Sequence, residues 1–147
     1  MTELEIGPYR LRVDEEETAR QFRALLPYAG GDVGVRMFLD CLCRAPEEPM
    51  AFLTSLGADP RRITVARPLA APDEKGEVLF LAALRLCGEL LSEDRAPRRS
   101  ARHAGMDLVV TADHGAFTPG VPDLPEPQIE LRFVLSLPFD PTFFQRI

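Results

Sequence analysis

The segment 128–138 reads Gln-Ile-Glu-Leu-Arg-Phe-Val-Leu-Ser-Leu-Pro, and it constrains the fold more than any other part of the chain. Its odd-numbered positions up to 137 are apolar, and its even-numbered positions are polar apart from Val134. Because successive side chains of a strand point to opposite faces, this alternation predicts a half-buried β-strand. Pro138 ends the strand, since proline has no amide hydrogen for the ladder. Such a strand is typical of an antiparallel sheet with one covered face.

The segments before it predict further strands and three helices. Short strands are expected at residues 4–6, 9–13, 63–69 and 106–111. Asp14 is suited to cap a helix that ends at Pro27, and its first turn is acidic, as the helix dipole favours. A second helix is expected over 35–44. A third begins near Glu47 and ends before Gly57, which is placed as its C′ residue.

Residues 78–91 are apolar almost throughout, so their period does not separate a buried helix from a pair of buried strands. Leu and Ala favour the helix, whereas Gly88 disfavours it. Residues 92–105 are polar, with four arginines and no apolar period, and we expect them to form a mobile surface loop.

These elements predict an α+β fold, in which two or three helices pack on one face of an antiparallel sheet. The 147 residues fit a single domain, 1–147. A chain of this size buries roughly 70% of its unfolded surface, so it needs neither disulfides nor a metal to hold a core. The hydrophobic content of 46% is ordinary for such a domain.

The net charge of −6 argues against nucleic-acid binding and against an anionic membrane surface, since both require clustered Lys and Arg. The chain starts Met-Thr-Glu-Leu-Glu, which is too acidic for a signal peptide, and its apolar runs are too short for a membrane helix. We therefore expect a cytoplasmic protein. The arginines at residues 95–102 have no interleaved aromatic residues and are expected to be a solvated surface rather than an anion site.

Three stretches resemble a family of small uncharacterised bacterial proteins, a domain of unknown function. They are Ile6-Gly7-Pro8-Tyr9, residues 52–60 (Phe-Leu-Thr-Ser-Leu-Gly-Ala-Asp-Pro) and residues 125–133 (Pro-Glu-Pro-Gln-Ile-Glu-Leu-Arg-Phe). The resemblance implies a hairpin-like segment at residues 78–91, hence two strands there. Members of that family carry a Cys-x-x-Cys-Arg-Asn-Phe element after the first helix. Here Val35-Arg36-Met37-Phe38 occupies that place, so no metal or redox role is carried over.

Asp113 and His114 are the sharpest chemical signal, because Thr-Ala-Asp-His-Gly at 111–115 is similar to a metal-binding string of the alkaline phosphatase superfamily. Those enzymes need several more ligands, and the chain has one further histidine, His103. A turn formed by Asp113 and Gly115 is the simpler interpretation. The three cysteines, Cys41, Cys43 and Cys87, are expected to be buried thiols. Cys41 and Cys43 lack a second cysteine pair, which argues against a zinc site. We therefore expect no metal and no cofactor.

The favoured function is a non-catalytic protein-binding module, with an immunity- or antitoxin-like role as one concrete version. Because acidic residues outnumber basic ones, 23 to 17, the expected partner is a basic protein. The candidate binding surface consists of Asp14, Glu15, Glu16, Glu17, Glu47 and Glu48. Helix capping explains the same residues without a partner. The alternatives are a small metal-dependent hydrolase that uses Asp113 and His114, and a small-ligand carrier with a pocket between sheet and helices.

Overall fold

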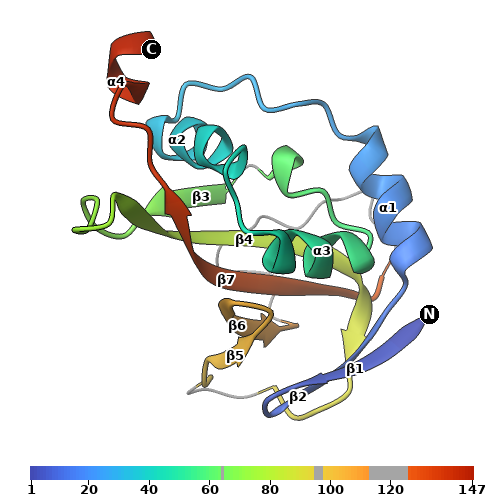
Figure 1. The fold of residues 1–147 in the computed structure, drawn as a ribbon. Coiled ribbons are helices and arrows are strands. Elements are labelled where there is room, and N and C mark those ends of the chain that lie inside the picture. Colours follow the sequence, from blue (N-terminus) through green and yellow to red (C-terminus); the bar gives the residue numbers. More distant parts are fainter. Residues whose placement is uncertain (64, 95–97, 113–125) are drawn as a thin grey trace.

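A computed structural model describes residues 1–63, 65–94, 98–112 and 126–147. The chain has an α+β fold, in which helices pack on one face of an antiparallel sheet (Figure 1). The described elements are β1 (Thr2–Ile6), β2 (Tyr9–Val13), α1 (Glu15–Ala24), α2 (Val33–Leu42), α3 (Glu47–Ser55), the 3₁₀ turn η1 (Pro60–Arg62), β3 (Val65–Pro68), β4 (Glu77–Leu90), β5 (Ala101–His103), β6 (Met106–Thr111), β7 (Gln128–Pro138) and α4 (Phe143–Arg146).

The sheet runs in the order β1-β2-β4-β7-β6-β5, and β3 lies beside the first half of β4. All described strand pairs are antiparallel. The sheet curls so strongly that β1 and β5, at opposite ends of this order, come into contact. The hydroxyl of Tyr9 on β2 donates a hydrogen bond to the carbonyl of Arg99, just before β5. The sheet therefore has a concave inner face and a convex outer face.

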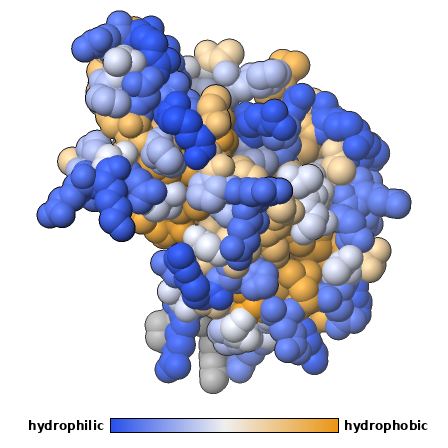
Figure 2. Space-filling model, in the orientation of Figure 1, coloured by the Kyte–Doolittle hydropathy of each residue, from blue (hydrophilic) through white to orange (hydrophobic). Residues whose placement is uncertain are grey.

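The core lies between the inner face and the helices. Phe80 of β4 and Phe133 of β7 both contact the ring of Phe38 from α2, at centroid distances of 5.4 and 6.5 Å. All three rings are buried. The alternation in 128–138 therefore predicts the apolar side of β7 correctly. Figure 2 shows that the apolar surface visible from this side gathers between the helices and the sheet, inside a polar rim.

The helices begin and end close to the predicted positions. The carboxylate of Asp14 caps α1 by accepting a hydrogen bond from the Glu17 amide (3.0 Å). The carboxylate of Asp32 caps α2 by accepting one from the Val35 amide (3.0 Å). Gly57 follows α3 with φ +87°, a backbone that favours glycine. A Cβ there would lie 2.2 Å from the carbonyl oxygen of Glu15, so the end of α3 rests directly on the first turn of α1 (Figure 1).

Residues 78–91 form neither a helix nor two strands, and the prediction of two strands is wrong. Residues 78–90 belong to one long strand, β4, which pairs with β7 along its first eleven residues, Glu77 to Cys87. Both faces of β4 are covered beyond Leu81, which removes the alternation that would have identified a strand. Gly88 pairs with Val13 of β2, and the two backbones approach so closely that a Cβ at this position would lie 2.2 Å from the Arg12 carbonyl oxygen.

The prediction of a loop over residues 92–105 is also wrong in part. Residues 101–103 form β5, which pairs with β6 around a turn at Ala104 and Gly105. Arg98 is held by Asp94, with 2.9 Å between guanidinium Nε and carboxylate oxygen. None of the helices in the described part of the chain has the length and apolar character needed to cross a membrane.

Candidate functional site

The outer face of the sheet departs from the expected polar, solvated surface. At one end, a row of side chains runs across three strands in register: Arg85 of β4, Glu130 of β7 and Thr111 of β6. The relative exposures of these residues are 6%, 0% and 0%. Since β7 alternates, Glu130 was expected on the solvated side of the strand. The structure buries it instead, so charged groups are buried on the face opposite the apolar core.

Glu130 is the centre of this buried end. One carboxylate oxygen lies 3.7 Å from the Arg85 guanidinium, and the other accepts a hydrogen bond from Nε of Arg132, two residues along the same strand. A buried carboxylate is stable only when charged or hydrogen-bonding partners compensate for its lost hydration. Two arginines in contact with one carboxylate supply that compensation. The cluster Arg85–Glu130–Arg132 is called the buried charge cluster below.

Asp94 ties the segment after β4 to the end of β6. Its carboxylate accepts hydrogen bonds from the Ala112 amide (2.9 Å), the Thr111 hydroxyl (3.2 Å) and Arg98. Burial alone would raise the pKa of Asp94, but these donors outweigh burial, so its pKa lies below the ordinary value. Burial also raises the pKa of Tyr9 nearby. A tyrosine with a raised pKa stays protonated at neutral pH.

The other end of the outer face is apolar and open. Leu69 is the residue after β3, and its amide donates a hydrogen bond to the carbonyl of Leu79 on β4 (2.8 Å), so the two leucines are neighbours. Their exposed fractions are 47% and 46%. Leu81 of β4 and Val134 of β7 are register partners on the same face and are half-buried. These four side chains, Leu69, Leu79, Leu81 and Val134, are called the open apolar end below.

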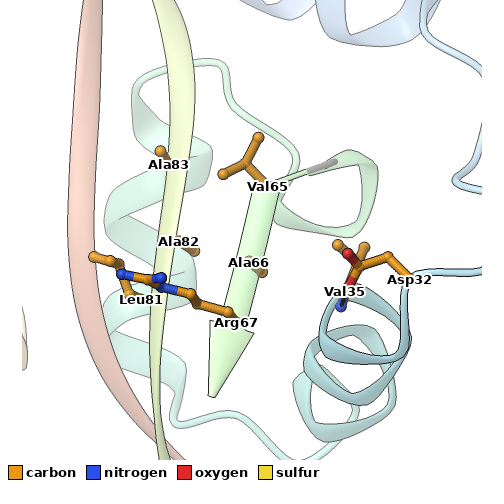
Figure 3. A pocket seen from close by; sticks show the side chains of 8 residues that line it. All are labelled: Asp32, Val35, Val65, Ala66, Arg67, Leu81, Ala82 and Ala83. Atoms are coloured by element: carbon orange, nitrogen blue, oxygen red, sulfur yellow. Dashed lines mark hydrogen bonds between the residues drawn. The ribbon is translucent and has the colours of Figure 1, made fainter. Parts of the chain in front are cut away.

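A cavity of about 310 Å³ adjoins the open apolar end (Figure 3). It lies between the start of α2 and the strands β3 and β4. Its lining residues are Asp32, Val35, Val65, Ala66, Arg67, Leu81, Ala82 and Ala83. In Figure 3 the Arg67 side chain extends from β3 toward Leu81, away from α2. The Asp32 carboxylate is already engaged in capping α2. Arg67 is therefore the group in this cavity that is suited to meet an anion.

The acidic residues of α1 are mostly engaged within the chain. Asp14 caps the helix, and Glu15 accepts a hydrogen bond from the Thr2 hydroxyl (2.9 Å). Glu17 is held by Arg20 and Gln21, whose hydrogen bonds lower its pKa to about 2. Glu16 is exposed and forms no ion pair with a described residue. Capping and local pairing thus account for three of the four carboxylates.

The structure does not bring the two acidic segments together. Glu47 and Glu48 are exposed at the start of α3, whereas the other end of α3 rests on α1. Nine helical residues rise about 13 Å, so α3 itself separates the two groups. Within the described residues neither glutamate has an ion-pair partner. The six predicted carboxylates therefore form two separate surfaces.

Asp113 and His114 lie outside the described residues. The other histidine, His103, packs edge-on against Phe52, with 4.7 Å between ring centroids. No group of three His, Cys, Asp or Glu side chains in the described ranges is arranged to hold a metal ion. Cys41 and Cys87 are buried, and burial raises the pKa of both thiols, that of Cys41 to about 11. Cys43 is exposed, so the prediction of buried thiols is right for two of the three.

No protein-family model, curated protein or solved structure matches the chain.

Proposed function

We propose that this chain is a non-catalytic protein-binding module and that the open apolar end of the outer sheet face is its binding surface. The observation that carries the proposal is the exposure of Leu69 and Leu79 side by side, where the chain leaves β3 and is still hydrogen-bonded to β4. Single exposed leucines are normal, but a contiguous apolar patch on a soluble domain is typical of an interaction site. An immunity- or antitoxin-like role is one form that such binding would take.

Leu81 and Val134 extend this patch toward the middle of the sheet, and both retain part of their accessible surface. Register partners on neighbouring strands present their side chains to one face, where the side chains of a partner can interdigitate with them as they do between stacked sheets. The polar residues around it provide the rim that excludes water from such contacts.

The experiment compares three immobilised forms of the protein: the wild type, Leu79→Glu and Leu26→Glu. Leu26 is 85% exposed in the connection after α1, so its variant introduces the same charge at another exposed leucine. We expect the wild type and Leu26→Glu to retain the same partner protein from the host extract, and Leu79→Glu to lose it. Equal retention by all three forms would remove the open apolar end as the binding surface.

The exposed carboxylates Glu47 and Glu48 support a second candidate surface, for a basic partner. Association there would slow as salt screens the attraction. The test measures thermal stability and partner affinity of Glu47→Lys beside those of Glu16→Lys. Lost affinity in Glu47→Lys with unchanged stability supports the surface. Unchanged affinity in both variants leaves helix capping as the role of these residues.

The cavity of Figure 3 favours the small-ligand carrier as an alternative function. Its volume is at the lower end of the range of about 300–1,000 Å³ for ligand sites. Six of its lining residues are aliphatic, and Arg67 would recognise a carboxylate or phosphate group. Native mass spectrometry of the purified protein tests this: a retained small molecule, lost in Arg67→Ala, would support the carrier.

A further inference from the structure

One row of side chains crosses the open apolar end from edge to edge. Arg67 of β3 pairs with Leu81 of β4, Leu81 with Val134 of β7, and Val134 with Asp107 of β6. Register partners in antiparallel strands point to the same face. All four side chains therefore lie on the outer face, with a cation at one end, an anion at the other and apolar groups between. Three strand spacings separate the Arg67 and Asp107 backbones by about 14 Å.

The two charges at the ends of this row are available to a partner. Arg67 is exposed, and no described acidic residue forms an ion pair with it inside the chain. Asp107 contacts Arg102 at 3.6 Å, but both side chains are largely in water, at 47% and 68% exposure. An exposed pair of this kind is weak, so the Asp107 carboxylate can accept a second guanidinium at low cost.

The order of charges in the row is self-complementary. When two copies of the face are related by a two-fold axis parallel to the strands, each row meets the other in reverse. Arg67 of one copy then lies against the partner's Asp107, and the partner's Arg67 lies against Asp107 of the first. Leu81 and Val134 meet at the centre, flanked by Leu69 and Leu79. Such an interface is isologous, the commonest arrangement in homodimers.

We infer that the occupant of the open apolar end is a second copy of this chain, bound through two Arg67–Asp107 pairs around a leucine centre. The inference rests on the proposed function and names the partner for its binding surface. The row spans only about 14 Å between the Arg67 and Asp107 backbones, so the face is smaller than a standard interface, which buries roughly 800 Å² on each partner. The dimer is therefore expected to dissociate on dilution, with a dissociation constant of about micromolar order.

The test uses sedimentation equilibrium on the full chain and on two charge reversals, Arg67→Asp and Asp107→Arg. Each variant alone would place like charges opposite each other twice, so each should dimerise about tenfold or more weakly than the wild type. When the two are mixed in equal amounts, every opposed pair is again of opposite sign. The mixture should therefore form a heterodimer with close to wild-type affinity.

Circular dichroism is used to check that both variants fold. Leu26→Glu is the control that leaves the face intact. A wild type that stays monomeric up to about 200 µM would overturn the inference, since even low-end interfaces associate there. A dimer that persists in both variants, or variants whose mixture does not associate, would also overturn it. If the wild type is monomeric yet retains another protein through Leu79, the proposed function stands and only the second copy falls. If the wild type neither dimerises nor retains another protein through Leu79, the proposed function and the second copy are both wrong.

Discussion

The outer face of the sheet has two ends with opposite character. At one end the charged residues Arg85 and Glu130 are buried, and at the other end Leu69 and Leu79 are exposed. The inner face carries apolar side chains throughout and is covered by helices. Both ends of the outer face belong to the same strands, β4 and β7, so strand geometry is not the cause of the difference.

The comparison shows that position along a strand matters as much as the face. At the buried end, the carboxylate of Glu130 is compensated within the chain by its contacts with two arginines. At the open end, nearly half of the surface of Leu69 and Leu79 is left uncovered by the rest of the chain. The buried end is thus complete within one chain, whereas the open end is suited to contact a second one.

The first test places the same negative charge on the inner and on the outer face of the sheet, and the inner-face variant should give the largest loss of stability of all. Leu135 is 2% exposed on the inner face, so Leu135→Asp buries an unpaired carboxylate and should lower the free energy of unfolding by about 5 kcal/mol or prevent folding. Leu79→Asp, on the outer face, should change it by less than about 0.5 kcal/mol. Urea unfolding measures both, at protein concentrations low enough that association does not contribute. Equal destabilisation would mean that the outer face is not open at Leu79.

The second prediction concerns the buried charge cluster. Glu130→Ala removes the carboxylate that both Arg85 and Arg132 contact, and it should cost about 3–5 kcal/mol. Glu89→Ala is the matched control, because Glu89 also pairs with an arginine of the neighbouring strand, Arg12 at 3.3 Å. That pair is 40–45% exposed, so its loss should cost less than about 1 kcal/mol. Similar costs in urea unfolding would show that burial of Glu130 does not set its contribution.

The sequence predicts the inner side of the sheet better than the outer side. The odd positions of 128–138 and the caps at Asp14 and Gly57 follow local rules, and the structure confirms them. Glu130 has the same local signature as a solvated strand residue such as Ser136. Only the pairing of β7 with β4 brings Arg85 beside it, and no period in the sequence contains that information.

The candidate surface was missed for the same reason. Arg67, Leu81, Val134 and Asp107 come from four different strands, and their alignment depends on the register of three strand pairs. The acidic residues were visible because they are consecutive in the chain, yet most of those on α1 serve that helix. A weak signal was present in Leu79 and Leu81, which lie on the same side of an alternating strand. The near-continuous apolar run around them concealed it.

A third prediction uses cysteines as reporters of the two environments. Cys87 lies on the outer face at the buried end, opposite Gln128, and Cys41 lies in the core. Burial raises the pKa of both thiols, so both should react with a disulfide reagent about 100-fold more slowly than the exposed Cys43. In a Cys43→Ser background, Glu130→Ala should increase the reaction rate of the Cys87 thiol more than that of the Cys41 thiol. Equal acceleration would indicate loosening of the whole fold, rather than opening of the buried end.

The smallest effect is expected at Glu17, whose ion pair with Arg20 lies at the surface of α1. Hydrogen bonds from Arg20 and Gln21 lower its pKa to about 2, below the ordinary value near 4.5. The folded state therefore holds this carboxylate ionised more strongly than the unfolded state does. The stabilisation is present above about pH 4.5 and is lost as the pH falls toward 2.

Glu17→Gln should remove that contribution. The difference in midpoint of thermal unfolding between wild type and Glu17→Gln is then present at pH 7 and shrinks as the pH is lowered from about 5 to about 2. Glu16→Gln is the control, because Glu16 is exposed on the same turn without an ion pair among the described residues. A difference that stays constant with pH would mean that Glu17 acts through helix propensity and not through its charge. Because solvent screens this cluster, its contribution should stay well below that of Glu130, which makes burial the variable that separates the two carboxylates.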